Sequence, residues 1–367
     1  MIYLDHNATT PLDPRVLEAM LPFFQNFHGN ASALYRSGRI ARSALDNARE
    51  KLAALIDARP EQIIFTSGGT EANNLALHQL PNHAKIVISA SKHPSVTLPA
   101  LIKQTEGNDL IISEVDTKGI LKADFIDQTL WQKGDMVSVQ LANNETGVLQ
   151  PVDEYYQRLS EKQLILHTDA TQAVGKIPVN FSQLPVHLMT LSSHKINGPK
   201  GCGALVVAQD FQITPMLYGG GQEQNYRAGT ENIAGIVGFG KAAELALAEM
   251  TQRQQHLLAL RHQLEQGLRN IPDITLFSET VARLPNTIQW GKPNLDGEML
   301  VMQLDRLGIA VSSGSACASG GGKPSQTLRA MGVPEALAKS AVRVSLGYSN
   351  TEVEVATFIK TLHKLVG

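Results

Sequence analysis

The sequence contains very few cysteines, which limits the compartments and the kinds of site it can serve. Only Cys202 and Cys317 occur in 367 residues. A secreted protein of this size more often carries an even, spaced set of disulfide cysteines. No cysteines or histidines are paired at ligand spacing, so we expect no metal site. The scarcity of cysteine favours a reducing compartment.

The sequence also lacks segments typical of membrane or nucleic-acid binding. The first residues, MIYLDHNATTP, contain neither a basic n-region nor an apolar h-region, and no apolar run is long enough to span a bilayer. The formal net charge is −2, and the lysines and arginines are dispersed along the chain. We therefore expect a cytoplasmic protein that binds neither nucleic acid nor membrane.

Short apolar runs alternate with amphipathic segments through the middle of the chain. The runs are IIFTSGG, KIVISAS, MVSVQLANN, LILHTDA, LMTLSSHK and GALVVA. They are rich in Ile, Val and Leu and end in small or polar residues, as buried strands do. Helix-like segments such as TEANNLALHQL and VDEYYQRLSEKQ lie between them. This alternation predicts an α/β fold with a mostly parallel sheet covered on both faces, and a ligand site beyond the carboxyl ends of its strands.

The pattern changes in the second part of the chain. Residues 234–270 are dense in good helix formers and predict one or two long helices leaving the large domain. Beyond Pro272, the strand-like runs NTIQW and RVSLG and the helical run DGEMLVMQLDRLG predict a smaller α+β domain. The final helical segment begins after Thr351, with Glu354 three residues on in a capping-box arrangement.

Two residues at strand ends indicate a carbonyl cofactor. Lys195, in LSSHKINGPKG, follows an apolar run, where a desolvated amine could form a Schiff base. Taken alone, it is more often a surface lysine. Asp169 ends the run LILHTDA. It could keep the pyridine nitrogen of pyridoxal phosphate (PLP) protonated, or equally cap a helix.

Three further strand-end turns carry candidate residues. In TSGGTEANN a strand runs into Gly69, and a helix starting near Thr70 could bind phosphate, although many α/β turns look the same. His93 follows another strand and could stack on a ring or move a proton, but lone histidines are more often structural. Asn144 and Glu145, in QLANNETG, could reach a ligand or simply form a turn.

The smaller domain adds a cysteine and an arginine. Cys317 lies in VSSGSACASGGGKPS, a segment with almost no apolar anchor, so we expect a mobile loop with a reactive thiol. Cys202, at the start of an apolar run, is expected to fill the core. Arg343 lies inside a strand-like run and needs an anionic partner, either a substrate carboxylate or an internal salt bridge.

Taken together, these motifs resemble the cysteine desulfurases of the NifS/IscS type, which are class V aminotransferases and fold type I PLP enzymes. Matching segments follow the family's order along nearly the whole chain: YLDHNATTPLDP, FTSGGTEANN, NNETGVLQP, HTDATQAVGK, SSHKINGPKG, YRAGTEN, SSGSACAS and VRVSLG. The resemblance implies a seven-stranded sheet in a large PLP-binding domain, residues 14–255. It also implies a small domain, residues 1–13 and 256–367, that carries the mobile loop of the catalytic cysteine.

The resemblance also implies the residues that bind PLP. They are Gly69, Thr70, His93, Asn144, Asp169, Gln172, Ser192, His194, Lys195 and Thr230. Lys195 matches the lysine that holds the cofactor, and Asp169 matches the partner of its pyridine nitrogen. His93 matches the histidine stacked on the ring, and Gln172 the residue bonded to the phenolic oxygen. The phosphate cup is matched by Gly69, Thr70, Ser192 and His194. Thr230 matches a phosphate ligand donated by the other subunit, which implies a homodimer.

The implied reaction converts L-cysteine to L-alanine, with Lys195, His93 and Cys317 as the catalytic residues. Asn144 and Arg343 match groups that hold the substrate carboxylate. Cys317 matches the cysteine that forms a persulfide, which then passes to an acceptor protein such as an iron–sulfur scaffold or a tRNA-thiolation relay.

Two alternatives remain open. An aminotransferase or a selenocysteine lyase of class V would share Lys195 and Asp169, and Cys317 in its Gly/Ser segment is the discriminating feature. A non-catalytic interaction protein could keep the fold, but the presence of all three residues argues against it.

Overall fold

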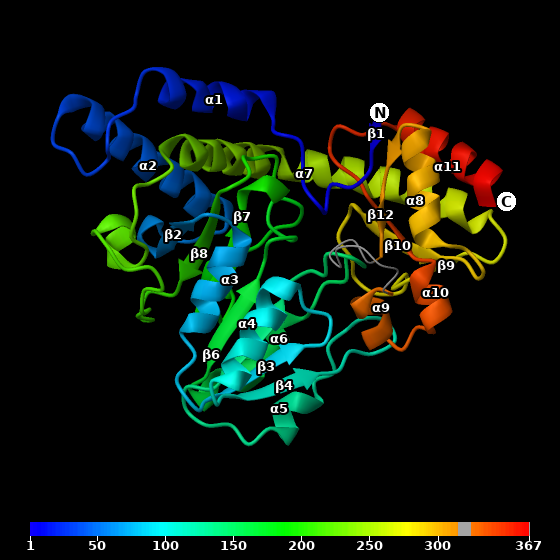
Figure 1. Ribbon diagram of the computed structural model, residues 1–367, viewed down its shortest axis with the longest axis horizontal. Helices are drawn as coiled ribbons and strands as arrows, with labels where there is room; N and C mark the ends of the chain where they lie inside the picture. Colours follow the sequence, from blue (N-terminus) through cyan, green and yellow to red (C-terminus); the bar gives the residue numbers. More distant parts are fainter. Residues whose placement is uncertain (315–323, 367) are drawn as a thin grey trace.

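The computed structural model describes residues 1–314 and 324–366, and a seven-stranded sheet forms the centre of its larger part (Figure 1). In spatial order the strands are β2 (Ile63–Thr66), β8 (Gly203–Val207), β7 (Leu188–Ser192), β6 (Ile165–Asp169), β5 (Met136–Gln140), β3 (Lys85–Ser89) and β4 (Asp109–Ser113). The five strands from β7 to β4 run parallel, and β8 is antiparallel to both of its neighbours. The predicted mostly parallel α/β sheet is therefore confirmed.

The apolar runs singled out in the sequence all form strands of this sheet. Every residue of β2, β5, β7 and β8 is buried, because helices cover both faces and leave no strand surface for water. The edge strand β4 was not predicted. It exposes Asp109 and Ile112, so its pattern is not the continuous apolar run of a buried strand.

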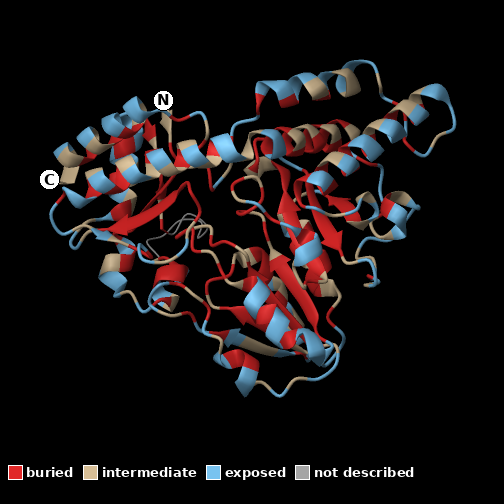
Figure 2. Cartoon of the chain, turned by 180° about the vertical axis from the view of Figure 1, so that it is seen from behind, coloured by how far each residue is buried: buried red, intermediate tan, exposed pale blue. Residues whose placement is uncertain are grey.

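Helices pack on the two faces of the sheet, and Figure 2 shows the buried strands between them. The helices are α1 (Pro14–Gln25), α2 (Arg36–Leu55), α3 (Gly69–His78), α4 (Pro94–Thr105), α5 (Asp124–Gln128), α6 (Val152–Leu159) and α7 (Ile233–Arg269). Helices α3 and α4 share a core with Ile86, whereas α1, α2, α6 and the first half of α7 share a core with Val87. These two neighbours in β3 point to opposite faces, as successive strand residues must.

Helix α7 connects the large part of the molecule to the small one (Figure 1). It is a single helix of 37 residues, the first of the two arrangements, one helix or two, that residues 234–270 predict. Its first half contributes Ile236 and Phe239 to the core of the large part, and its second half contributes Leu257 and Leu264 to the core of the small part. Because both halves of α7 are buried, the core of the large part and the core of the small part share this one helix.

The small part contains two short sheets. One is antiparallel, with the order β12 (Ser312–Ser313), β13 (Val342–Ser345), β10 (Thr287–Gly291) and β9 (Thr275–Leu276). The other pairs β1 (Ile2–Tyr3) in parallel with β11 (Ile309–Ala310). The helices are α8 (Gly297–Arg306), α9 (Gln326–Ala330), α10 (Glu335–Lys339) and α11 (Glu352–Val366). The predicted capping box is confirmed, since Glu354 accepts from Thr351 N at 2.9 Å and Thr351 Oγ1 accepts from Glu354 N at 3.2 Å.

The N-terminal residues lie with the small part, because β1 pairs with β11 and Asp5 bridges to Ser345. The exact division at residues 13 and 255 stays a prediction. None of the helices in the described ranges is both long enough and apolar enough to cross a bilayer.

Gly147 provides a test of the contact between the two parts. Its φ is +76°, and a Cβ there would lie 2.8 Å from Thr287 Cβ of β10. Gly308 has a similar φ of +78° but open space around a Cβ. We expect Gly308→Ala to cost about 1 kcal/mol of backbone strain. Gly147→Ala should cost roughly 1–3 kcal/mol more from overpacking.

The measurement is the free energy of unfolding from urea titration of both variants, with the unaltered chain as reference. Equal losses in the two variants would show that Gly147 does not pack tightly against β10.

Candidate active site

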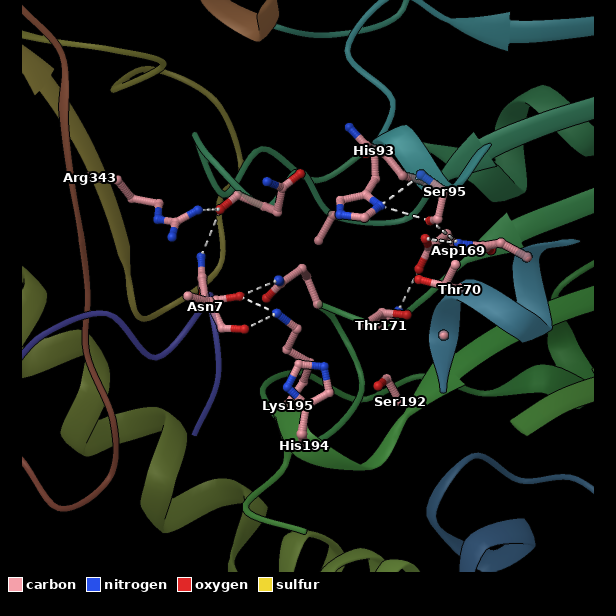
Figure 3. Close-up of a pocket in the computed structure, with 17 residues that line it drawn as sticks. Asn7, Thr70, His93, Ser95, Asp169, Thr171, Ser192, His194, Lys195 and Arg343 are labelled. Atoms are coloured by element: carbon pink, nitrogen blue, oxygen red, sulfur yellow. Dashed lines mark hydrogen bonds between the residues drawn. The ribbon is translucent and has the colours of Figure 1, made fainter. Parts of the chain in front are cut away.

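A cavity of about 340 Å³ lies beyond the carboxyl ends of β5, β6 and β7. Ten of the predicted site residues line it: Gly69, Thr70, His93, Asn144, Asp169, Gln172, Ser192, His194, Lys195 and Arg343. In Figure 3, Arg343, Asn7 and Lys195 gather on one side of the cavity, and Asp169 and Thr70 on the other. Residues that are far apart in the sequence therefore meet at one site.

One end of the cavity offers hydrogen-bond donors to an anion. Gly69 begins helix α3, whose first N–H groups have no partner within the helix. A Cβ at Gly69 would lie 3.4 Å from both Thr171 Oγ1 and Ser192 Cβ, so the helix start closely approaches these residues. Thr171 Oγ1 and Ser192 Oγ are buried and have no hydrogen-bond partner within residues 1–314 and 324–366. Two unused hydroxyls beside a helix N-terminus fit a phosphate group.

Asp169 ends β6 and is held as a carboxylate. Asn73 Nδ2 donates to its Oδ2 at 2.9 Å, and Thr171 N donates to its Oδ1 at 3.0 Å. Burial alone would raise the pKa of Asp169, but the charge of Lys92 and these hydrogen bonds outweigh burial and hold the pKa below its ordinary value. A half-buried carboxylate that stays ionised suits a cationic ring nitrogen.

His93 is the N-cap of α4 and is linked to Asp169 through shared partners. Its Nδ1 accepts from Ser95 N at 3.1 Å and lies 2.7 Å from Ser95 Oγ. Ser95 Oγ in turn accepts from Asn73, the residue that donates to Asp169. Burial lowers the pKa of His93, so the ring is neutral, and because Nδ1 accepts, its proton lies on Nε2.

Lys195 ends a single 3₁₀ turn, Ser193–Lys195, directly after β7. Its Nζ donates to the backbone carbonyls of Asn7 and, at 2.7 Å, of Ala8. Gln172 Nε2 also donates to the Asn7 carbonyl, at 3.0 Å. The N-terminal segment therefore closes the lysine side of the cavity.

His194, the neighbour of Lys195, is held by Thr9. Its Nδ1 lies 3.1 Å from Thr9 Oγ1. Burial, followed by the charges of Lys195 and Lys200, lowers the pKa of His194 to about 4. It is therefore neutral at physiological pH and acts as a hydrogen-bonding group rather than a cation.

Arg343, on β13, brings the small part of the molecule to the cavity. Its Nη1 donates to Asn144 O at 3.1 Å, and its Nη2 forms an ion pair with Asp5 at 2.6 Å. Its Nε is buried without a partner in the described part of the chain, so the guanidinium keeps one unused donor. Arg343 therefore makes the internal salt bridge that one interpretation of the sequence expected. It also lines the cavity, where the other interpretation expected it to bind a carboxylate.

Three candidates are not among the described residues that line the cavity. Thr230 is exposed and does not line the cavity of this chain. Cys317 and its predicted mobile loop lie outside the described residues. Glu145 does not line the cavity and instead accepts from the hydroxyls of Ser325 and Thr327. Of the two alternatives that the sequence left open for Glu145, the structure favours the one in which it does not contact a ligand in this cavity.

Sequence reasoning missed several residues that hold the site together. Asn73 and Ser95 connect Asp169 to His93, and Asn7 binds Lys195. Asn73 lies four residues after Gly69, on the same face of α3, which was an available signal. Asn7 lies in the YLDHNATT motif, but nothing local to that motif indicates its long-range bonds.

Several known proteins are similar to this chain in sequence. The model of the aminotransferase class V family matches residues 2–358. A cysteine desulfurase of a Nostoc species is 40% identical over the whole chain and 93% of its own length. The cysteine desulfurase IscS of Dictyoglomus turgidum is also 40% identical, over the whole chain and 94% of its own length.

Solved structures of NifS-like proteins are also similar to this chain. A NifS-like protein superposes with a TM-score of 0.93 at 34% identity, covering 99% of this chain and 98% of that one. A NifS-like protein of Rickettsia africae superposes with a TM-score of 0.91 at 35% identity, covering 100% and 99%. The chain therefore belongs to the class V aminotransferase family and, within it, to the PLP-dependent cysteine desulfurases.

Proposed function

We propose that this chain converts L-cysteine to L-alanine and carries the released sulfur on Cys317. The observation that carries the proposal is the single cavity on which Lys195, Asp169, Arg343 and the start of α3 converge. The volume of about 340 Å³ is in the range of small-molecule sites.

The residues of the cavity fit PLP in one orientation. Gly69, Thr70, Ser192 and His194 would hold its phosphate, Lys195 would bind its aldehyde, and Asp169 would face its pyridine nitrogen. His93 would lie on the ring, and Gln172 would donate to the phenolic oxygen. When bound, PLP withdraws electrons from the substrate α-carbon, which makes its proton removable.

Substrate binding and proton transfer are assigned to residues around Lys195. Arg343 and Asn144 bind the carboxylate of L-cysteine, and Arg343 Nε provides an unused donor for it. The Lys195 amine removes the proton from the α-carbon. His93 takes the proton of the substrate thiol, which requires the ring to release its Nδ1 bond to Ser95 or to exchange tautomers.

Sulfur transfer is assigned to Cys317. Its thiolate attacks the substrate sulfur, so that an S–S bond forms and the substrate C–S bond breaks. The electron pair of that bond remains on the carbon, which gains a proton and becomes the methyl group of alanine. Cys317 is left as a persulfide, whose outer sulfur passes to the thiol of an acceptor protein.

The relatives support L-cysteine as the substrate and transfer of sulfur to acceptor proteins. We further propose that the acceptor is an iron–sulfur scaffold or a tRNA-thiolation relay, and that the chain acts as a cytoplasmic homodimer. The exposure of Thr230 supports the dimer, since such a residue is available to the cavity of a second subunit. The relatives do not favour a selenocysteine lyase or another class V reaction.

The two cysteines provide the first test. Cys317→Ala should retain the visible absorbance of bound PLP and lose alanine release from L-cysteine, because only the sulfur acceptor is removed. Cys202→Ala is the matched control, since burial raises the pKa of its thiol to about 12 and makes it unreactive. Alanine is measured with and without a thiol reductant. Alanine release by Cys317→Ala at the rate of the unaltered chain would overturn the role of Cys317.

Arg343 provides the second test. Arg343→Lys should raise the KM for L-cysteine roughly 10- to 100-fold with a smaller change in kcat, because a charge-assisted contact is worth about 1.5–3 kcal/mol. Arg283→Lys is the control, because Arg283 is equally buried in an ion pair with Glu265 and does not line the cavity. A KM that is unchanged in Arg343→Lys would remove Arg343 from the carboxylate site.

Thr230 tests whether subunits share a site. Thr230→Ala should weaken PLP binding roughly tenfold, the cost of one lost hydrogen bond to a charged group. Mixing it with inactive Lys195→Ala should restore alanine release at limiting PLP. A hybrid dimer then contains one site with both residues intact. Mixtures that release no more alanine than the two variants measured separately would contradict donation across the dimer.

A further inference from the structure

The segment of residues 208–232 connects β8 to α7 and carries Thr230 near its end. An ion pair joins this segment to the start of helix α3, because Arg227 Nε and Nη2 donate to the two carboxylate oxygens of Glu71 at 2.8 and 3.2 Å. Glu71 is the third residue of α3, which begins at Gly69. The pair therefore links the helix assigned to the phosphate site of this chain to a residue assigned to the phosphate site of the other chain.

We propose that the ion pair between Glu71 and Arg227 is a positioning contact, which holds Thr230 of one chain in place for the cavity of the partner subunit. The inference rests on the proposed function in one respect, namely that Thr230 donates to the PLP phosphate across a homodimer. Neither Glu71 nor Arg227 is among the described residues that line the cavity of this chain, so the pair acts through Thr230 and not by contact with the cofactor.

The geometry of this ion pair fixes direction as well as distance. Two N–H groups of the planar guanidinium face both oxygens of one carboxylate. The Glu71 side chain is 11% exposed and the Arg227 side chain 22% exposed, so water screens the pair less than it screens a surface pair. Burial would raise the pKa of Glu71, but hydrogen bonds from Arg227 and Ser67 outweigh burial and hold the pKa below its ordinary value. The carboxylate is therefore ionised at physiological pH.

The backbone just before Arg227 is held in an unfavourable conformation. Residues 223–225 have φ values of 45°, 58° and 71°, in the left-handed region that residues with a Cβ seldom adopt. Glu223 is fixed at one side by its ion pair with Arg49 at 2.7 Å, and Arg227 is fixed at the other side by its own pair. Without the second anchor these residues can relax, because strained backbone persists only where its surroundings hold it. Thr230, three residues beyond Arg227, would then change position.

Thr230 itself needs such an anchor. It is exposed, and it follows Gly229, whose φ of +108° is accessible mainly to glycine, so the backbone beside it has many alternatives. Ordering a free segment when a ligand binds costs conformational entropy, and a segment that is ordered beforehand avoids this cost. We therefore expect the ion pair to raise the affinity of the partner subunit for the phosphate of PLP.

The first measurement compares the affinity for PLP with the affinity for pyridoxal, which lacks the phosphate. Both are obtained by absorbance titration of the full-length chain freed of its cofactor. Glu71→Gln and Arg227→Gln each remove one side of the pair. Each should weaken PLP binding about three- to tenfold and leave pyridoxal binding unchanged. Glu249→Gln is the control, because Glu249 also pairs with two arginines and does not line the cavity, and it should change neither affinity.

A double variant shows whether Glu71 acts through Thr230. The chain that carries both Glu71→Gln and Thr230→Ala should bind PLP no more weakly than Thr230→Ala alone, because no hydroxyl is left to position. Two losses that multiply would show that Glu71 acts on the phosphate by another route.

Hybrid dimers show which cavity the ion pair serves. Glu71→Gln, co-expressed with inactive Lys195→Ala, should restore alanine release at limiting PLP. In the hybrid, the only cavity with an intact Lys195 receives Thr230 from the chain whose Glu71 is also intact. If Glu71 instead served the phosphate site of its own chain, that same cavity would carry the substitution and alanine release would stay low.

The inference is overturned by PLP binding that is unchanged in both single variants, by an equal loss of PLP and pyridoxal binding, by an equal loss in Glu249→Gln, by multiplying losses in the double variant, or by hybrids of Glu71→Gln without restored release. Failure of the proposed function is recognised separately. In that case the unaltered chain releases no alanine, or Thr230→Ala itself does not complement Lys195→Ala, and the inference falls with it. Complementation by Thr230→Ala but not by Glu71→Gln rejects the inference alone.

Discussion

The geometry of the cavity depends on Asn7, whose polar atoms are bonded in the buried boundary between the two parts of the molecule. Its backbone carbonyl binds Lys195 and its side chain binds Lys176, both from the large part. The same residue donates to Thr287 and accepts at its side chain from Asn286, both in the small part. A fully satisfied buried network allows few alternative arrangements, since breaking one bond leaves a desolvated group without a partner. One asparagine thus couples the position of Lys195 to the packing of the small sheet.

This coupling explains how the small part contributes to chemistry that takes place at the edge of the large sheet. Arg343 lies on β13, in register with Gln289 of β10, and its ion pair with Asp5 joins it to the N-terminal segment. The segment that bonds Lys195 therefore also positions the arginine assigned to the substrate carboxylate. Lys195 and Arg343 are therefore both contacted by one short segment, residues 5–8, rather than by two independent elements.

The sequence predicted the parts of this site that depend on local pattern. Lys195 and Asp169 follow apolar runs, and parallel strands end at one edge of a sheet, so their convergence could be foreseen and is found. The edge strand β4 was not predicted, because its half-exposed residues do not form an apolar run. The pairing of Arg343 with Asp5 joins residues 338 positions apart, and no local pattern specifies such a partner. The same holds for the bonds of Asn7. The roles of Cys317 and Thr230 come from the family resemblance and stay predictions.

The charges around the cavity favour anions over cations. Lys195 and Arg343 line it, and Lys92 lies buried behind Asp169. Burial and neighbouring positive charges keep His93 and His194 neutral, so the histidines add no further repulsion between cations. Burying lysines and an arginine in this way is costly unless anions neutralise them. A phosphate and a carboxylate supply that neutralisation on binding. The charges at this cavity therefore favour the binding of anionic groups, such as a phosphate and a carboxylate, over cations.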